Sequence, residues 1–425
     1  MSKEKLEFLQ RSKEFWNPGK TQDWQDMGVD LVIDRREGYY LFDMDGRRLL
    51  DLHLNGGTYN LGHRNPELVE VLKSASDRFD MGNHHFPALA RTALAEALAA
   101  CAPAPGMHYT AYGSGGGEAI DIALKTARHA MKKRKIVSII KAYHGHTGLA
   151  LKTGDDRFSK LFLSEDTEGE FVQVPFNDLN AMEDALRKRD VAAVIMETIP
   201  ATYGFPMPDE GYLPGVKKLC ERYDALYIAD EVQTGLMRTG ELWGCTRYGI
   251  QPDIMVTGKG IGGGMYPIGC TLISEHCAGW LHEDGFGHIS TGGGAELGCV
   301  VSMKVLEMVQ RPEVRATVGM ISDFMRAGLE EIMAEYPDFF IGIRQHGLVM
   351  GLEFNHEQGA KPVMKHLYEN GVWAIFSTLD PRVLQFKPGL LLSQSDCEEV
   401  LRRVEIGIGL ARDEIMGRGS RRGVA

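Results

Sequence analysis

Several apolar stretches of the chain end in a polar residue that a buried strand would not otherwise need. The stretch ALYIAD ends in Asp230, VAAVIME ends in Glu197, and IVSII is followed closely by Tyr143 and His144. A fourth stretch, DIMVTGK, ends in Lys259, which is surrounded by glycines. Continuous apolar runs of this length predict buried strands of a parallel sheet. Because ligands of such sheets bind outside the carboxyl ends of the strands, we expect these side chains to form one site.

A glycine-rich turn supplies a second part of the predicted site. The strand-like segment HYTAY leads into GSGGGE, which contains Gly115, Gly116 and Gly117, and then into a helical pattern. A glycine turn that opens a helix presents unpaired N–H groups and the positive end of the helix dipole, which suits a phosphate. The spacing matches neither the dinucleotide-binding motif nor the P-loop motif, because Glu118 and Asp253 occupy positions that need glycine. A nucleotide-binding dehydrogenase is therefore only a remote alternative.

A phosphate-binding turn, an aromatic residue, a buried acid and a lysine among glycines together indicate a site for pyridoxal 5′-phosphate (PLP). The lysine of such a site forms a Schiff base with the cofactor aldehyde and later acts as a base. An aspartate keeps the pyridine nitrogen protonated, so that the ring can accept electrons. We therefore predict that Lys259, Asp230 and Glu197 are catalytic. A snorkelling surface lysine would explain Lys259 alone, but not its occurrence together with Asp230 and the turn.

The pattern of elements predicts a fold that can position these residues. From about 51 to 310 the chain alternates β-branched apolar runs with amphipathic helices, which predicts a large, doubly wound α/β domain with a mostly parallel sheet. Residues 311–425 show a long helix and then mixed strands and helices, which predicts a smaller α+β domain. Residues 1–50 contain the D-G turn of a hairpin and are expected to pack with this smaller domain.

Composition and charge argue against several other classes of protein. The 425 residues are 44% apolar and 25% charged, as in an ordinary globular protein. The net charge of −11 argues against a nucleic-acid partner. No signal-peptide or membrane-spanning pattern is visible, so we expect a cytoplasmic protein without a membrane partner. The seven cysteines form no C-x-x-C, and the histidine spacings do not match a usual zinc set, so no metal site is predicted.

The segments ALYIADEVQTG and PDIMVTGKGIGGGMYPIG resemble the signature of class III, PLP-dependent aminotransferases of fold type I, and the similarity extends over nearly the whole chain. The resemblance implies that Lys259 carries the cofactor, that Asp230 pairs with the pyridine nitrogen and that Glu197 supports the ring edge. It also implies a homodimer with shared active sites, acting on small-molecule amine and carbonyl substrates. At the phosphate, the resemblance implies contacts of Gly115, Gly116 and Gly117, and of Thr291 with the phosphate of the neighbouring subunit. At the cofactor ring, it implies Tyr143 and His144 of the YHG motif, with the Tyr143 ring on one face. Val232 is then expected on the other face, and Gln233 near the 3′-oxygen.

Two departures from the family pattern occur together and concern the substrate. Many members specific for amino acids have an arginine in R-F-x-P-P-L that binds the substrate carboxylate, and a glutamate in E-P-x-x-x-E that pairs with it. In this chain the two positions are Gln385 and Thr202. Because both partners are replaced, neither is left as an unpaired buried charge. We therefore expect a neutral or polyhydroxylated amine or aldehyde, similar to the amino sugars of aminoglycoside-type antibiotic biosynthesis, although Lys387 or Arg382 could replace the arginine.

The same residues leave the reaction open between two classes of enzyme. In an aminotransferase, Lys259 removes the proton next to the substrate nitrogen and returns it to the cofactor. Return of the proton to the substrate carbon would make an epimerase or racemase, and transfer within one molecule would make an aminomutase. We expect the aminotransferase, and an inactive binding module is disfavoured because all the catalytic candidates are present. His84 and His85 of GNHHF could also face the substrate.

Overall fold

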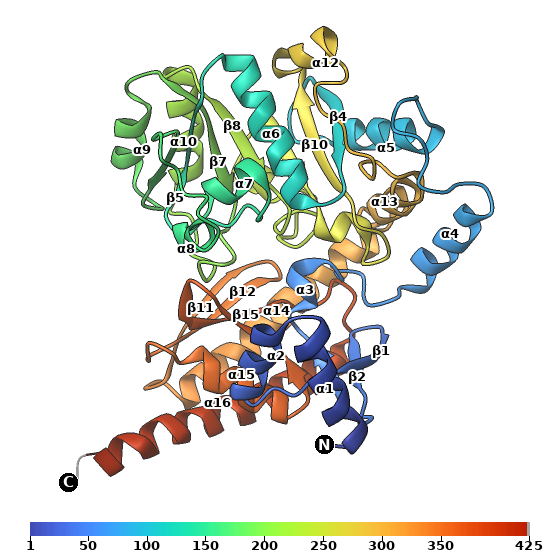
Figure 1. Cartoon of the computed structure of the whole chain (residues 1–425). Coiled ribbons are helices and arrows are strands. Elements are labelled where there is room, and N and C mark those ends of the chain that lie inside the picture. The colour runs from blue at the N-terminus through green and yellow to red at the C-terminus, as the bar shows by residue number, and fades with distance from the viewer. Residues whose placement is uncertain (423–425) are drawn as a thin grey trace.

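The computed structural model describes residues 1–422, with side chains described up to residue 417. Figure 1 shows green and yellow elements around a large sheet, and below them the blue N-terminal elements beside the orange and red C-terminal elements. Segments from the two ends of the chain therefore form one structural part. The residue boundaries at 51 and 311 stay predictions.

The large sheet has seven strands in the order β4-β10-β9-β8-β7-β5-β6. Strands β9, β8, β7, β5 and β6 are parallel, whereas β10 is antiparallel to both β9 and β4. The mostly parallel sheet of the predicted fold is confirmed, and the antiparallel pair lies at one edge. The strands are β4 (Met107–Gly113), β5 (Lys135–Ile139), β6 (Phe171–Val174), β7 (Val191–Glu197), β8 (Leu226–Asp230), β9 (Ile254–Thr257) and β10 (Gly269–Ser274).

Helices cover both faces of this sheet. Every residue of β7 is buried, because its apolar side chains are divided between two different apolar clusters. One cluster includes the apolar face of α6 (Gly116–Met131), and the other includes α10 (Tyr212–Arg222) and α13 (Glu296–Val309). This two-sided burial explains the continuous apolar runs of the sequence. The other elements of this part are α4 (Pro66–Ser76), α5 (Leu89–Ala100), α7 (Gly148–Thr153), α8 (Asp156–Lys160), α9 (Leu179–Leu186), α11 (Gly244–Arg247), α12 (Gly279–Glu283) and the 3-10 helices η1 (Lys259–Gly262) and η2 (Glu275–Cys277).

Two four-stranded sheets form the smaller part. In one sheet the N-terminal strands pair with a strand from the other end of the chain, because β13 runs parallel to β3. The order of the other sheet is β11-β12-β15-β14. No helix within the described residues combines the length and apolar character needed to cross a membrane. The elements are α1 (Lys3–Phe15), α2 (Pro18–Asp26), β1 (Ile33–Glu37), β2 (Tyr40–Asp43), β3 (Arg48–Asp51), α14 (Pro312–Glu335), β11 (Phe340–His346), β12 (Val349–Phe354), α15 (Ala360–Glu369), β13 (Val372–Trp373), β14 (Ile375–Ser377), β15 (Asp380–Phe386) and α16 (Gln394–Arg422).

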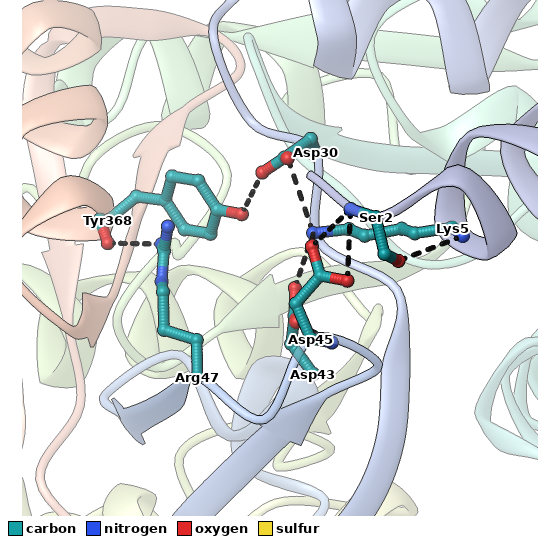
Figure 2. A network of polar contacts seen from close by, with 7 residues as sticks. All are labelled: Ser2, Lys5, Asp30, Asp43, Asp45, Arg47 and Tyr368. Atoms are coloured by element: carbon teal, nitrogen blue, oxygen red, sulfur yellow. Dashed lines mark hydrogen bonds and ion pairs between the residues drawn. The ribbon is translucent and has the colours of Figure 1, made fainter.

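A polar network fixes helix α1 to this smaller part (Figure 2). The buried Lys5 Nζ lies 2.6 Å from Asp43, 3.2 Å from Asp30 and 3.7 Å from Asp45. The hydroxyl group of Tyr368 in α15 donates a hydrogen bond to Asp30 (2.5 Å), so the network reaches a C-terminal helix. One lysine of the first helix thereby connects the two ends of the chain.

Candidate active site

The ends of three neighbouring strands bring the predicted catalytic residues together. Glu197 is the last residue of β7 and lies in register with Asp230, the last residue of β8. Lys259 follows β9, which pairs with β8. Its φ of 45° is a left-handed value that a residue with a side chain adopts only under constraint from its surroundings. The carboxyl edge of the sheet therefore carries two carboxyl groups and an amine, as the apolar stretches predicted.

Asp230 is buried and held by two donors. Its Oδ2 lies 2.7 Å from Nδ1 of the buried His144, and its Oδ1 accepts a hydrogen bond of 3.0 Å from the backbone N–H of Val232. The other nitrogen of the imidazole, Nε2, has no hydrogen-bond partner among the described residues. The YHG motif thus places His144 against the aspartate, and this contact was not predicted from the sequence.

Glu197 and Lys259 have altered acidities because both groups are enclosed. Burial raises the pKa of the Glu197 carboxyl group to about 7, with a further increase from Asp230 and opposing effects of His144 and Lys259. The Glu197 oxygens accept hydrogen bonds from the N–H groups of Tyr143 (3.2 Å) and Ala201 (3.1 Å). Burial lowers the pKa of the Lys259 amine, and the charges of Asp230 and Glu197 oppose this effect. A lysine with a lowered pKa is more available as a nucleophile and base near neutral pH.

The glycine turn lies beside Lys259 at the start of α6. The first N–H groups of a helix have no acceptor within it, and the predicted Gly115, Gly116 and Gly117 occupy these positions. A Cβ atom on Gly116 would lie 3.2 Å from a methyl carbon of Val232, and one on Gly258 would lie 3.2 Å from the Cα of Gly116. The backbone segments at Gly116, Val232 and Gly258 therefore pack so closely that there is little room for larger side chains. A cavity of about 310 Å³ adjoins them, lined among others by Asn55, Tyr59, Gly115, Gly116, Lys259 and Tyr266.

These residues fit PLP. The lysine is available for the aldehyde, and the helix N-terminus offers N–H donors to a phosphate. The side-chain oxygen of Gln233 is buried and has no hydrogen-bond partner among the described residues. It lies near Lys259, because a Cβ atom added to Gly56 would be 3.9 Å from this oxygen and 3.1 Å from Cε of Lys259. An acceptor without a donor at this position suits the hydroxyl group of the cofactor ring. Within residues 1–422, no group of three His, Cys, Asp or Glu side chains is arranged to hold a metal ion.

Two further predicted cofactor residues, Tyr143 and Thr291, lie in loops. The ring of Tyr143 contacts His146 and Phe158, with centroid distances of 5.1 and 5.9 Å. Thr291 is exposed in a loop whose neighbouring Ser290 hydroxyl lies 3.4 Å from that of Ser114. The loop thus reaches the glycine turn of its own chain, while the side chain of Thr291 contributes no hydrogen bond among the described residues.

The structure does not bring His84 and His85 to Lys259. The two imidazoles stack on each other at 4.0 Å, and His85 lies 5.9 Å from the exposed ring of Phe286. Neither side chain lines the cavity beside Lys259. A contact with substrate stays an untested prediction for both residues.

The predicted substrate residues Gln385 and Thr202 come from strand β15 and from the loop after β7. Gln385 is buried near the end of β15, and its amide oxygen accepts a hydrogen bond from the amine of Lys387. The carbonyl of Thr202, in the loop after β7, accepts a hydrogen bond of 3.1 Å from the N–H of Leu379. Arg382 does not face a free position, because its guanidinium is bonded to Asp380 at 2.9 Å. Of the two proposed replacements for the arginine, only Lys387 lacks a carboxylate partner among the described side chains.

Helix α3 (Leu54–Gly57) is a part of the site that the sequence did not predict. Its residues Leu54, Asn55 and Gly56 all have positive φ values, and a Cβ on Gly56 would lie 3.1 Å from Cε of Lys259. The only signal was the letters LNGG, which are typical of a turn. These residues lie close to Lys259 because of the way in which the N-terminal segment packs, and the local sequence pattern does not predict that packing.

Comparisons with known proteins agree over most of the chain. The model of the family described as aminotransferase class-III matches residues 21–406. An uncharacterized aminotransferase of Archaeoglobus fulgidus is 42% identical over 401 residues, covering 94% of this chain and 93% of the relative. A putrescine aminotransferase of Pectobacterium atrosepticum is 30% identical, covering 90% and 81%. The crystal structure of ornithine aminotransferase from Toxoplasma gondii has a TM-score of 0.87, with 23% identity and 96% coverage of both chains.

The family match accounts for the arrangement at the strand ends. Class III aminotransferases use PLP, and the lysine, the buried aspartate and the helix N-terminus described above are suited to that cofactor. The structural likeness extends over both parts of the chain and supports fold type I. The protein accordingly belongs to the class III aminotransferases and is a PLP-dependent enzyme of that family.

Proposed function

We propose that the enzyme takes the amino group from a neutral or polyhydroxylated amine, such as an amino sugar, that carries no α-carboxylate. The observation that carries this proposal is Gln385, which occupies the position of the family arginine and is bonded to Lys387 instead of to an acid. The neighbouring Arg382 is neutralised by Asp380 and lies 3.6 Å from Glu353, so it is not free to bind a substrate carboxylate.

The residues of the site have distinct roles in this reaction. PLP, when bound, supplies a pyridine ring that accepts the electron pair released at the substrate carbon. Lys259 takes the proton from that carbon, since its amine has a lowered pKa and it lines the cavity beside the glycine turn. Asp230 keeps a proton at the pyridine nitrogen, and His144 fixes the orientation of its carboxylate. Glu197 adds a carboxyl group beside Asp230 that is half protonated near neutral pH.

The names of related proteins support part of this proposal. Putrescine, in the name of the Pectobacterium relative, carries no carboxylate, whereas ornithine and acetylornithine, in the names of several structural neighbours, carry one. Neither of the two relatives described above is named for an amino sugar. A panel of amines is therefore the direct test of the substrate class.

The test is a single half-reaction without a carbonyl acceptor. The PLP-loaded enzyme is mixed in deuterated water with ethanolamine, putrescine, glucosamine, ornithine and glutamate, and the visible absorption of the cofactor is followed. We expect an amine without an α-carboxylate to convert the cofactor to pyridoxamine phosphate fastest, and Lys259→Ala to abolish the conversion. Faster conversion by glutamate or ornithine would contradict the proposed substrate class. Deuterium in the recovered amine, without loss of the original cofactor band, would identify an epimerase or racemase instead.

We further propose that the active enzyme is a homodimer. An exposed apolar surface lies on the loop before α5, on the first residue of α5 and on the segment after α12; Phe86, Leu89, Phe286 and Ile289 are each more than half exposed. Exposed apolar patches of this kind are typical of association surfaces. The surface adjoins the loop of Thr291, so a second copy seated there would bring the two Thr291 loops close to the shared boundary.

Subunit mixing tests this arrangement. Lys259→Ala and Thr291→Ala enzymes are each expected to be impaired, and co-refolded heterodimers should recover activity. The reason is that one of the two sites would then combine an intact Lys259 with an intact Thr291 from the other subunit. If mixing restores nothing, Thr291 does not act across the dimer. Light scattering of the unmixed enzyme gives the oligomeric state independently.

A further inference from the structure

Lys387 is an enclosed amine without a carboxylate partner, close to the reaction centre. It follows β15 directly and is only 2% exposed. Its Nζ lies 5.2 Å from the centre of the Phe205 ring, and it forms no ion pair with an acid within the described residues. Its one side-chain hydrogen bond there is to the amide oxygen of Gln385. Burial of an amine away from water is unfavourable, and a single neutral acceptor offsets only part of this free energy. We therefore expect Lys387 to have a role beyond packing.

Lys387 is bonded through its backbone to the segment that packs on Lys259: its N–H donates a hydrogen bond of 2.8 Å to the carbonyl of Leu52, and a Cβ on the nearby Gly56 would lie 3.1 Å from Cε of Lys259. Burial lowers the pKa of the Lys387 amine well below its usual value, and the positive charges of Arg238 and Lys259 lower it further. Asp51 and Glu197 oppose this effect. Lys387 therefore lies beside the segment that confines Lys259, and its partner Gln385 stands at the position that corresponds to the family arginine.

The contact between the two side chains determines which way the Gln385 amide is turned. A lysine amine donates hydrogen bonds, and an amide group has one oxygen acceptor and one nitrogen donor. With the oxygen occupied by Lys387, the amide nitrogen of Gln385 points away from Lys387, and it donates to no described residue. Gln385 thus offers two N–H groups without a formal charge.

We propose that Lys387 is a positioning residue that turns the Gln385 amide nitrogen toward the substrate, where it binds an uncharged oxygen such as a hydroxyl group. This inference rests on the proposed function, because it assigns a neutral oxygen to the place where other members bind a carboxylate. It identifies hydroxylated amines as the preferred class. An amide donor suits a hydroxyl oxygen, whereas an arginine is the stronger binder of a carboxylate.

The test compares two amines that differ only in hydroxyl groups, serinol and isopropylamine, in the half-reaction of the PLP-loaded enzyme. We expect serinol to have about a three- to tenfold higher kcat/KM, as one hydrogen bond provides, with the difference mainly in KM. The ratio should fall to near one in Gln385→Leu and in Lys387→Met. It should survive in Lys387→Arg, since a guanidinium can still donate to the amide oxygen. If the half-reaction is too slow to measure, the dissociation constants of serinol and isopropylamine, obtained from the change in cofactor absorption, are compared instead of kcat/KM.

A matched control removes another lysine that lies over a phenylalanine ring. Lys361 Nζ lies 5.2 Å from the ring of Phe376, and Lys361→Met should leave the serinol ratio unchanged. A purely structural effect of Lys387→Met would slow both amines equally and preserve the ratio. A ratio near one in the unaltered enzyme, a ratio that survives Lys387→Met, or no binding of either amine would overturn the inference. Failure of the proposed function is seen separately, as faster conversion of glutamate or ornithine than of any amine lacking an α-carboxylate.

Discussion

Glu197 shows how enclosure sets the chemistry of a single residue. Burial raises the pKa of its carboxyl group to about 7, and Asp230 contributes further in the same direction. As the pH falls through that value, Glu197 gains a proton and the site loses one negative charge. We predict that an infrared band of a protonated carboxyl group, absent in Glu197→Gln, titrates with a midpoint near pH 7 in the cofactor-free enzyme. Asp230→Asn should move the midpoint to lower pH, because it removes a neighbouring negative charge.

The control for this titration is Glu353→Gln, because Glu353 forms an ion pair with Arg344 at 2.9 Å in the smaller part of the molecule. This substitution should leave the band unchanged. A midpoint near pH 4.5, the ordinary value of a glutamate, would show that water or counter-charges relieve the burial of Glu197.

At the scale of elements, α3 is the segment that confines the side chain of Lys259. Gly56 has a φ of 70°, and a Cβ there would lie 3.1 Å from Cε of Lys259. Gly46, in the hairpin of β2 and β3, has a φ of 79° but no atom within 4 Å of its Cβ position. Both Gly→Ala substitutions should cost about 1 kcal/mol of stability through backbone strain.

Only Gly56→Ala should slow the binding of PLP to Lys259, measured as the growth of the cofactor absorption after mixing with the cofactor-free enzyme. The reason is that only this methyl group would press on the lysine side chain. Equal rates for Gly56→Ala and Gly46→Ala would show that the contact between α3 and Lys259 does not constrain the amine.

The elements also show what the sequence could and could not predict. The placement of Asp230 and Lys259 at one edge of the sheet could be predicted, because a charged residue at the end of an apolar run is costly to bury unless it serves a site, and because neighbouring parallel strands end at the same edge. The contact of His144 with Asp230 was not predicted, since it depends on a side-chain rotation inside the fold. The meeting of Lys387 with Phe205 was not predicted either. It joins two loops whose relative position is set by the packing of the smaller part against the large sheet.

At the scale of the whole molecule, the N-terminal segment is secured by one buried ion cluster (Figure 2). Lys5 is 2% exposed and lies 2.6 Å from Asp43, whose side chain is also buried. Removal of one partner from such a cluster leaves an uncompensated buried charge, which costs about 3–5 kcal/mol. Lys5→Met is therefore expected to lower the free energy of unfolding by this order in urea titrations, with α1 separating first.

Lys3 offers the matched substitution on the same helix, since its side chain is 90% exposed and its contact with Glu7 is 3.6 Å. Lys3→Met should have no measurable effect, because exposed ion pairs contribute little. Limited proteolysis should cut Lys5→Met, but not Lys3→Met, near the connection between α2 and β1. The hairpin that follows leads through β3 into α3, so loosening of α1 should also slow the binding of PLP to Lys259. Equal stability of the two variants would show that the N-terminal helix is held by its apolar contacts alone, and that the Asp43 cluster contributes nothing to the order of the site.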